Sequence, residues 1–510
     1  MRSGSGATPP LVVTLDVGSS SVRALAFDAR ARALAQCRRE YEMDTTPDGG
    51  VEIDAERLLG LTATVLDDLL AALGAAAGEM AGVAMSTFWH TVLGVGPDGR
   101  AATPLYSWAD TRSAGLVETL RKRLDEKAYH ARTGSLLHTS YLPARLLWLR
   151  ERDPAGFRAI RRLLSFGEYV HLRLFGETRT SISIASGTGL FDQRALGWDG
   201  PTLRALDLEP ERLGPLADLD APLLGLCPEF AARWPALARV PWLPALGDGA
   251  CSNVGAGCTG PERAALMVGT SGALRVSWPT DAIVPPQGLW CYRVDRRRIL
   301  LGGSLANGGS VYAWLSETLR LGPPREIEAA LAGLEPDAHG LTLLPFLAGE
   351  RSTGWMPTAR GAVVGLSLAT RPIDILQAGL ETVAYRFALI HERLREVCPR
   401  AAAVVATGGA LTASPVWTRI MTDVLGVPIQ PSLEPEGSAR GAALLALEAL
   451  GAIPSVEAVP GAVGPPVAPD PGRHARYRDA LARHRELYAA LVPFFIAAPR
   501  SPGGLGSSSR

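Results

Sequence analysis

The same short pattern occurs near the start of the sequence and again just past its middle. Residues 11–28 contain an apolar run, an aspartate, a turn of small residues and a second apolar run, and residues 266–275 repeat this plan without the aspartate. Apolar runs that flank Gly and Ser predict a β-hairpin. A single Gly-Ser turn is also typical of ordinary hairpins. The second copy favours duplicated domains that hold one polyphosphate between them.

The residues of these turns suit phosphate binding. Small residues let backbone N–H groups and hydroxyls approach a phosphate closely. The aspartate at the mouth of the first turn, Asp16, can hold a metal ion or cap its own turn. We therefore assign the phosphates to six turn residues, namely Gly18, Ser19, Ser20, Gly269, Thr270 and Ser271.

The composition excludes several classes of protein. With 510 residues, 47% of them hydrophobic and 20% charged, the chain is expected to form two or three globular domains. Its formal net charge of zero argues against broad binding to nucleic acid. The only lysines, Lys122 and Lys127, do not follow a glycine, so a Walker A motif and a protein-kinase site are absent.

The cysteines and the apolar runs indicate a cytoplasmic protein. The six cysteines form no CxxC pair and no metal-ligand spacing, so we expect free thiols in a reducing compartment. Residues 1–10 read as a disordered tail rather than a signal peptide. We expect no apolar run to be long enough to span a bilayer, because the Ala-rich stretch after Asp68 is interrupted by Gly and Glu79.

Hydrophobic periodicity predicts alternating strands and helices in both halves. In the first half we expect a helix that Asp54 caps, followed by a buried strand over 81–85. The second half is predicted to contain strands over 299–302, 341–345, 403–406 and 427–430, and helices over 309–319, 373–397, 414–425 and 473–491. A further helix is expected to begin within residues 436–443.

Seven motifs occur in the order found in one family, and together they cover nearly the whole chain. The sequence resembles the FGGY carbohydrate kinases, of the sugar-kinase, actin and heat-shock ATPase superfamily. The motifs are residues 16–20, 108–112, 247–249, 269–272, 349–351, 408–410 and 423–426. Within the family the resemblance is strongest to the gluconokinases, through residues 89–91, 107–113, 167–169, 183–192 and 290–292. One departure is Arg145, which stands where the family usually has lysine; it keeps the charge but need not keep the geometry.

The resemblance implies an α/β fold of two ribonuclease-H-like domains, each with a five-stranded mixed sheet, and a catalytic cleft between them. The sugar-binding domain with the first phosphate hairpin would span 11–258, and the ATP-binding domain would span 259–455. A linker and a terminal helix would follow over 456–497, and a second disordered tail over 498–510. The resemblance leaves a homodimer open.

The resemblance also implies roles for individual residues. Asp248 would be the catalytic base and would share Mg²⁺ with Asp16, with glycines on both sides leaving room for a substrate hydroxyl. Without the surrounding pattern, Gly247-Asp248-Gly249 would be read as a turn. Gly408, Gly409 and Ala410 would lie at the adenosine, although Gly-Gly after a strand is often only a turn. The weaker candidates there are Asn307 and Gly308.

The sugar would contact four residues, His90, Trp108, Asp110 and Arg112. His90 also fits a buried core histidine, because it follows an apolar strand. Trp108, Asp110 and Arg112 would project to one side if their segment were extended. Arg112 could bind a carboxylate, or it could instead hold Asp110 in place.

The expected reaction is the transfer of phosphate from ATP to a sugar or sugar acid, with D-gluconate as the best single substrate. Three alternatives stay open: another FGGY substrate such as xylulose, ribulose, glycerol or another polyol, a non-catalytic sensor, and a chaperone-like or filament ATPase. The presence of a base and two phosphate turns argues against the sensor. The motif at 108–112 argues against the ATPase, since it would have no purpose without a sugar.

Overall fold

The first half of the chain builds a five-stranded sheet in the order β14-β6-β1-β2-β3. The hairpin predicted at the start forms β1 and β2, which pair antiparallel, while β6 and β14 run parallel to β1. The strands are β1 (Leu11–Val17), β2 (Ser21–Phe27), β3 (Ala33–Glu40), β6 (Met80–Thr87) and β14 (Leu246–Gly247). Because β1, β6 and β14 are parallel, their carboxyl ends lie at the same edge of the sheet.

The second half repeats this order and adds one strand. Its sheet runs β17-β18-β16-β15-β21-β22, so the antiparallel pair β15–β16 corresponds to β1–β2 and the parallel strand β21 to β6. The strands are β15 (Arg263–Val268), β16 (Gly272–Pro279), β17 (Trp290–Arg293), β18 (Arg298–Leu305), β21 (Ala403–Thr407) and β22 (Ile429–Pro431). The expected five strands were one too few, because β17 extends the edge beside β18.

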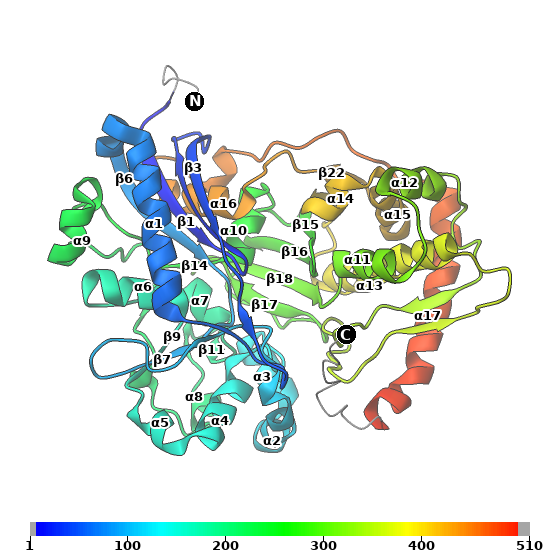
Figure 1. Ribbon diagram of the computed structural model, residues 1–510, viewed down its shortest axis with the longest axis horizontal. Coiled ribbons are helices and arrows are strands. Elements are labelled where there is room, and N and C mark those ends of the chain that lie inside the picture. Colours follow the sequence, from blue (N-terminus) through cyan, green and yellow to red (C-terminus); the bar gives the residue numbers. More distant parts are fainter. Residues whose placement is uncertain (1–6, 498–510) are drawn as a thin grey trace, which may run out of the picture.

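Helices pack against both sheets (Figure 1). The buried residues form two large hydrophobic cores, one in each half. In the first half, α1 (Ala55–Leu73) packs on β2 and β3, and Asp54 caps it as predicted through the Arg57 N–H at 2.7 Å. The second half contains α11 (Gly309–Thr318), α12 (Pro324–Ala332), α13 (Pro372–Val397), α14 (Gly409–Ala413) and α15 (Pro415–Leu425). Here α13 packs on β16 and β18, and α14 packs on β15 and β21.

One helix crosses between the halves. The helix α16 (Gly437–Ala449) belongs by sequence to the predicted ATP-binding domain, yet it packs on β1 and β6 and on α10 (Asp248–Gly255). Its residues Ala439 and Ala442 to Leu447 are part of the first hydrophobic core. Figure 1 shows α16, in orange, beside the blue strands of the first sheet. A helix from late in the chain therefore completes the core that the first strands begin.

Shorter elements are inserted between the strands of the two sheets, most of them between β6 and β14. The helices are α2 (Val117–Arg123), α3 (Glu126–Thr133), α4 (Leu142–Arg152), α5 (Pro154–Ala159), α6 (Phe166–Phe175), α7 (Ile182–Ser186), α8 (Gly200–Ala205) and α9 (Pro228–Arg233). A small three-stranded sheet is formed by β4 (Asp44–Thr45), β5 (Val51–Ile53) and β8 (Leu105–Tyr106). The remaining short strands form two-stranded sheets: β7 (Leu93–Val95) with β9 (Arg162–Leu164), β10 (Thr180–Ser181) with β13 (Leu216–Ala217), β11 (Phe191–Asp192) with β12 (Gly197–Trp198), and β19 (Thr342–Leu344) with β20 (Ala362–Val364).

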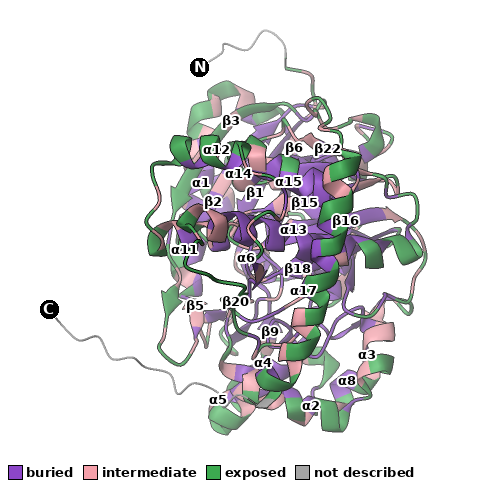
Figure 2. Cartoon of the chain, turned by 90° about the vertical axis from the view of Figure 1, so that its right-hand side faces the viewer, coloured by how far each residue is buried: buried purple, intermediate pink, exposed green. Residues whose placement is uncertain are grey.

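The last helix, α17 (Pro471–Ala497), lies along the surface, where most of it is exposed (Figure 2). It starts earlier and ends later than the predicted range of 473–491. Its buried residues, which include Tyr477, Leu481 and His484, lie on the side that meets α13 and α15.

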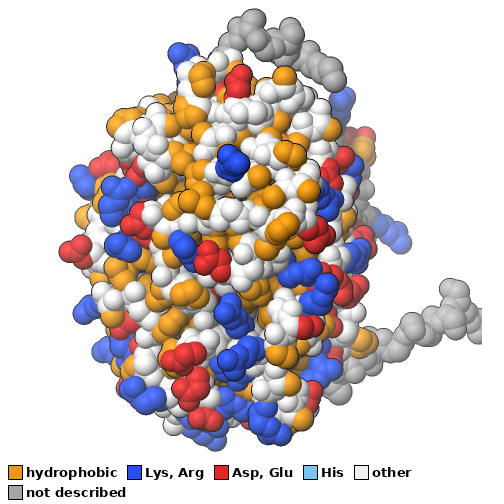
Figure 3. Space-filling view, turned by 90° about the vertical axis from the view of Figure 1, so that its left-hand side faces the viewer, with side chains coloured by type: hydrophobic (Ala, Val, Ile, Leu, Met, Phe, Trp, Pro, Cys, Tyr) orange, Lys and Arg blue, Asp and Glu red, His pale blue; other side chains and the backbone are white. Residues whose placement is uncertain are grey.

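On the face of the molecule shown in Figure 3, acidic and basic side chains are interspersed.

The computed structural model describes residues 7–497. The predicted tail at 498–510 and the first six residues of the predicted tail at 1–10 lie outside this range. The predicted tail at 1–10 extends too far, because Thr8 is bonded to the fold. Its N–H donates to Asp28 Oδ2 at 3.3 Å, and its carbonyl accepts from the Ala29 N–H at 2.7 Å. All six cysteines are free thiols, four of them buried.

One helical stretch, Ala55–Glu79, is long and apolar enough to cross a bilayer by length and composition alone, so our expectation that no run would suffice was wrong. The glycines that interrupt the sequence do not end α1 before Gly74. The apolar side of α1, which includes Leu58, Leu66 and Leu69, is buried in the first core. Within residues 7–497 no other helix meets this criterion.

Candidate active site

A cavity of about 230 Å³ lies where the two halves meet, and both hairpins reach it. Ser19 from the β1–β2 turn and Ser271 from the β15–β16 turn are on its wall. The turns themselves are open: Ser19, Ser20 and Thr270 are exposed, and Gly18, Gly269 and Ser271 are half-buried. The structure therefore brings the two predicted phosphate turns to a single space.

Asp248 lies on the wall of the same cavity. It follows β14 directly and is the first residue of α10, so the end of a parallel strand fixes its position. The Gly249 N–H donates to its Oδ1 at 2.8 Å. Removal from bulk water raises the pKa of this carboxyl to about 6, while the nearby Arg275 guanidinium acts to lower it. A carboxyl that titrates near neutral pH is suited to accept a proton from a hydroxyl.

The glycines on both sides of Asp248 have a different purpose from the one predicted. A Cβ on Gly247 would overlap the Trp89 indole, and a Cβ on Gly249 would lie 2.7 Å from the same ring and 2.5 Å from Arg275 Nη1. Trp89 is itself held in place, because its Nε1 donates to the Ser183 carbonyl at 3.0 Å. The two glycines therefore make room for Trp89 rather than for a substrate hydroxyl.

His90 lines the cavity beside Trp89. Its Nδ1 hydrogen-bonds to the Gly187 carbonyl, and because a carbonyl only accepts, Nδ1 carries the proton. Burial lowers the pKa of His90 to about 3, so the ring is neutral and its Nε2 is an acceptor. Arg145, the departure from the family pattern, donates to the His90 carbonyl at 2.7 Å and so supports the backbone of this residue.

Of the predicted motif at 108–112, only Trp108 reaches the cavity. The prediction of an extended segment was wrong, because the Asp110 N–H closes a turn on the Ser107 carbonyl and a 3₁₀ helix follows over Arg112–Leu116. Arg112 pairs with Asp110 at 2.5 Å and with Glu52, and its side chain is 5% exposed. This geometry supports the structural role that we left open for Arg112.

Asp16 lies at the end of β1 and is 2% exposed. It pairs with Arg23 at 2.6 Å, and Arg23 also pairs with Glu436 at 2.5 Å. The charge of Asp16 raises the pKa of Asp248, so the two carboxylates repel each other. Two repelling carboxylates beside the phosphate turns fit a divalent cation, which prefers oxygen ligands and would relieve the repulsion.

The two glycines of the predicted adenosine site differ in their surroundings. Gly408 has a φ of +89°, and a Cβ there would lie 2.6 Å from the Val268 carbonyl oxygen, so the backbone of β15 requires this glycine. Gly409 faces open space, and Ala410 follows it in α14. Gly308 is also needed by the fold, because a Cβ there would lie 2.6 Å from the Ser271 carbonyl oxygen.

The cavity also contains residues to which we had assigned no role. Arg275 on β16 and Arg351 in the loop after β19 both line it, as do Trp290 and Tyr292 on the extra strand β17. Arg275 could have been found as a charged residue in an otherwise apolar strand. Arg351 lies inside one of the seven motifs, and Trp290 and Tyr292 lie inside a stretch that carries the resemblance to gluconokinases.

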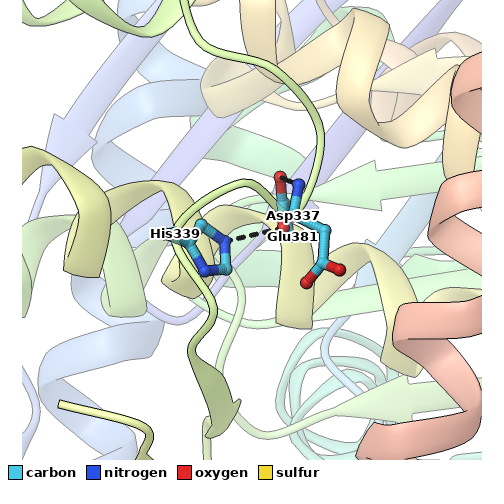
Figure 4. Close-up of side chains that lie close together, drawn as sticks. All are labelled: Asp337, His339 and Glu381. Atoms are coloured by element: carbon cyan, nitrogen blue, oxygen red, sulfur yellow. Dashed lines mark hydrogen bonds and ion pairs between the residues drawn. The ribbon is translucent and has the colours of Figure 1, made fainter.

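Asp337, His339 and Glu381 form the one group within residues 7–497 whose side chains are close enough together to share a metal ion (Figure 4). The Leu341 N–H donates to His339 Nδ1 at 2.9 Å, so His339 Nε2 carries the proton and donates to Glu381 at 3.0 Å. Glu381 also accepts from three other side chains, those of Gln377, Tyr385 and Tyr477. Asp337 pairs with Arg483. Because protein donors already bond to both carboxylates, we interpret the group as a hydrogen-bond network that joins neighbouring elements rather than as a metal site.

Comparison with known proteins decides the family. Residues 11–255 match the FGGY family of carbohydrate kinases, N-terminal domain, and residues 264–450 match the C-terminal domain of the same family. The chain belongs to the FGGY carbohydrate kinases. It is therefore an ATP-dependent sugar kinase, and the two-domain fold that the resemblance implied is confirmed.

Similar FGGY kinases act on several substrates. The gluconokinase of Bacillus subtilis is 28% identical over 426 residues, which cover 81% of each chain. A glycerol kinase of Alcanivorax borkumensis is 28% identical over 494 residues, covering 93% of this chain and 98% of its own. Among solved structures, gluconate kinase from Lactobacillus acidophilus has a TM-score of 0.88 at 25% identity and covers 94% of this chain and 98% of its own. Xylulose kinase from the same organism has a TM-score of 0.90 at 25% identity, covering 95% and 99%.

Proposed function

We propose that this FGGY kinase transfers the γ-phosphoryl group of ATP to the terminal hydroxyl of D-gluconate and so forms 6-phosphogluconate. The observation that carries the proposal is Asp248, a carboxylate on the wall of a cavity that both phosphate turns reach. The similarity to the gluconokinase of Bacillus subtilis supports gluconate as the acceptor.

In this mechanism Asp248 accepts the proton of the attacking hydroxyl. Trp89, wedged against both neighbouring glycines, holds the Asp248 backbone, while the neutral His90 and Trp108 contact the sugar. The backbone N–H groups and hydroxyls of the turns at Gly18 and Gly269 would bind the phosphates. Mg²⁺, held by Asp16 and Asp248, would neutralise charge on the β- and γ-phosphates when bound.

The test is ADP release with Mg-ATP in the presence of gluconate, xylulose, ribulose or glycerol. We expect gluconate to give the highest kcat/KM. Asp248→Asn should lower kcat about 10²–10⁴-fold, because the base is lost while the shape is kept. Asp207→Asn is the matched control, since the Asp207 side chain is 93% exposed.

The outcomes separate the parts of the proposal. If a different sugar gives the highest kcat/KM and Asp248→Asn is inactive, the mechanism stands and gluconate is the wrong substrate. An Asp248→Asn enzyme that is as active as the unmodified one would refute the role of the base.

A further inference from the structure

The charges on the cavity wall do not balance. Its charged residues are one carboxylate, Asp248, and two guanidinium groups, Arg275 and Arg351. Neither guanidinium makes an ion pair or a hydrogen bond to any residue within 7–497. Arg275 Nε and Nη2 and Arg351 Nε are buried without a partner.

Such a lack of hydrogen bonds and ion pairs is unusual among the buried arginines. Six arginines of the described chain are buried, and Arg275, which is 5% exposed, is the one whose guanidinium makes neither a hydrogen bond nor an ion pair. Asp248 is near enough for the two charges to attract each other, but it does not bond to the guanidinium. The other five donate to carboxylates or to main-chain carbonyls; they are Arg145, Arg293, Arg298, Arg386 and Arg440. A buried cation is costly unless it is paired. The hydrogen-bonding partner of Arg275 is therefore expected to come from outside the chain.

The surrounding structure accommodates both side chains. Arg275 crosses over Gly302 on β18, where a Cβ would lie 2.8 Å from Arg275 Cγ. The Arg351 guanidinium lies 5.7 Å from the centre of the Trp108 ring and 5.5 Å from that of Trp355, so two aromatic faces hold it. Arg112, the arginine that we first considered for a substrate carboxylate, is already paired with Asp110 and Glu52.

We propose that Arg275 and Arg351 bind the carboxylate of the substrate and thereby make this enzyme select a sugar acid over a neutral polyol of the same length. The inference rests on the proposed kinase function and specifies how the acceptor is recognised. A guanidinium pairs with a carboxylate through two parallel N–H bonds, and this pairing is strongest where water is excluded. A sugar acid would supply the anion that the cavity lacks.

The experiment compares gluconate with D-glucitol, which has the same carbon chain without the carboxylate. The ratio of their kcat/KM values is measured for the unmodified enzyme and for Arg275→Gln and Arg351→Gln. We expect the preference for gluconate to fall about 10–100-fold in the variants, the effect of losing a hydrogen bond to a charged group. Arg275→Lys and Arg351→Lys should restore part of it. Arg400→Gln, at a side chain that is 69% exposed, is the control.

The ratio also tests the competing explanation, in which the guanidinium groups bind only the transferred phosphate. In that case turnover of both substrates falls equally, the ratio is unchanged in both variants, and our proposal is overturned. A fall of the ratio in at least one variant supports the proposal and assigns the carboxylate to that arginine.

Calorimetry with gluconate and glucitol in the absence of nucleotide gives the same comparison if turnover is lost. It also separates this inference from the proposed function. Arginine-dependent preference for gluconate binding, without its phosphorylation, would retain the inference and refute the function. If gluconate is phosphorylated, but gluconate and glucitol bind equally well to the unmodified enzyme and to every variant, the proposed function stands and the inference is refuted.

Discussion

At the scale of single residues, the environment of Asp248 makes the activity depend on pH. Burial raises the pKa of this carboxyl to about 6, and the base must be ionised to accept a proton. We predict that kcat/KM for the sugar falls about tenfold per pH unit below pH 6. A pH–rate profile between pH 4.5 and 8 measures this.

Varying the Mg²⁺ concentration provides a control for this pH–rate profile. Because Asp248 is proposed to share Mg²⁺ with Asp16, raising the Mg²⁺ concentration should move the acid limb to lower pH, since a nearby cation favours the carboxylate. A limb below pH 5 at every Mg²⁺ concentration would contradict the raised pKa.

Sequence and structure agree on single residues where the backbone alone decides. Asp248 comes directly after β14, and Ser271 lies in the turn between β15 and β16, so the strand pattern was enough to place them. Arg112 shows the limit, because its partner Glu52 is distant in the sequence and no periodicity connects the two. The absence of a hydrogen bond to Arg275 could not be predicted either, because it depends on whether any neighbouring element places an acceptor within reach of the guanidinium.

At the scale of elements, the contact between α10 and α16 depends on glycine. A Cβ on Gly441 would overlap the Cys251 carbonyl, and a Cβ on Gly255 would overlap the Gly437 carbonyl. The two helices can therefore approach until their backbones touch. Since α10 begins with Asp248, this contact also helps to position the proposed base.

We predict that Gly441→Ala lowers the free energy of unfolding by about 1–3 kcal/mol, because the added methyl group forces the helices apart. It should also lower kcat, because α10 carries Asp248. Urea unfolding and steady-state kinetics on the same sample measure both effects.

Gly60→Ala in α1 is the matched control, since a Cβ there meets no atom within 4 Å. It should leave kcat unchanged and raise the free energy of unfolding by about 0.5–1 kcal/mol, the usual gain for this change inside a helix. If Gly441→Ala behaves like Gly60→Ala, the close contact of α10 and α16 does not matter for stability.

Periodicity predicted most elements, including α1 and α13, but not β17. Residues 290–293 are a short strand whose side chains are all buried, so they show no alternation that would reveal it. Because β17 was not predicted, its two residues on the cavity wall, Trp290 and Tyr292, were not assigned to the site.

At the scale of the whole molecule, buried histidines make stability depend on pH. Burial lowers the pKa values of His90, His138 and His484 to about 3 and that of His171 to about 4. In the unfolded chain these groups take up protons near pH 6.5. Between pH 6.5 and 4 the unfolded state therefore binds more protons, so the stability of the fold decreases as the pH falls.

His171 allows a clean test, because neither of its ring nitrogens has a partner in the described structure. We predict that His171→Phe removes about one proton from the acid dependence, or up to about 1.4 kcal/mol per pH unit. Urea unfolding at pH 5, 6 and 7 measures the slope. The raised pKa of Asp248 acts in the opposite direction, but it is the same in both proteins. An unchanged slope would contradict the prediction.

The crossing of α16 also governs how the protein can be made. A ribosome releases the first sheet long before residues 437–449, so the surface of β1 and β6 that α16 covers stays apolar and unprotected while most of the second domain is synthesised. The first domain can complete its core only when the last quarter of the chain has emerged. The two halves, although each resembles an independent unit, therefore reach their native state together.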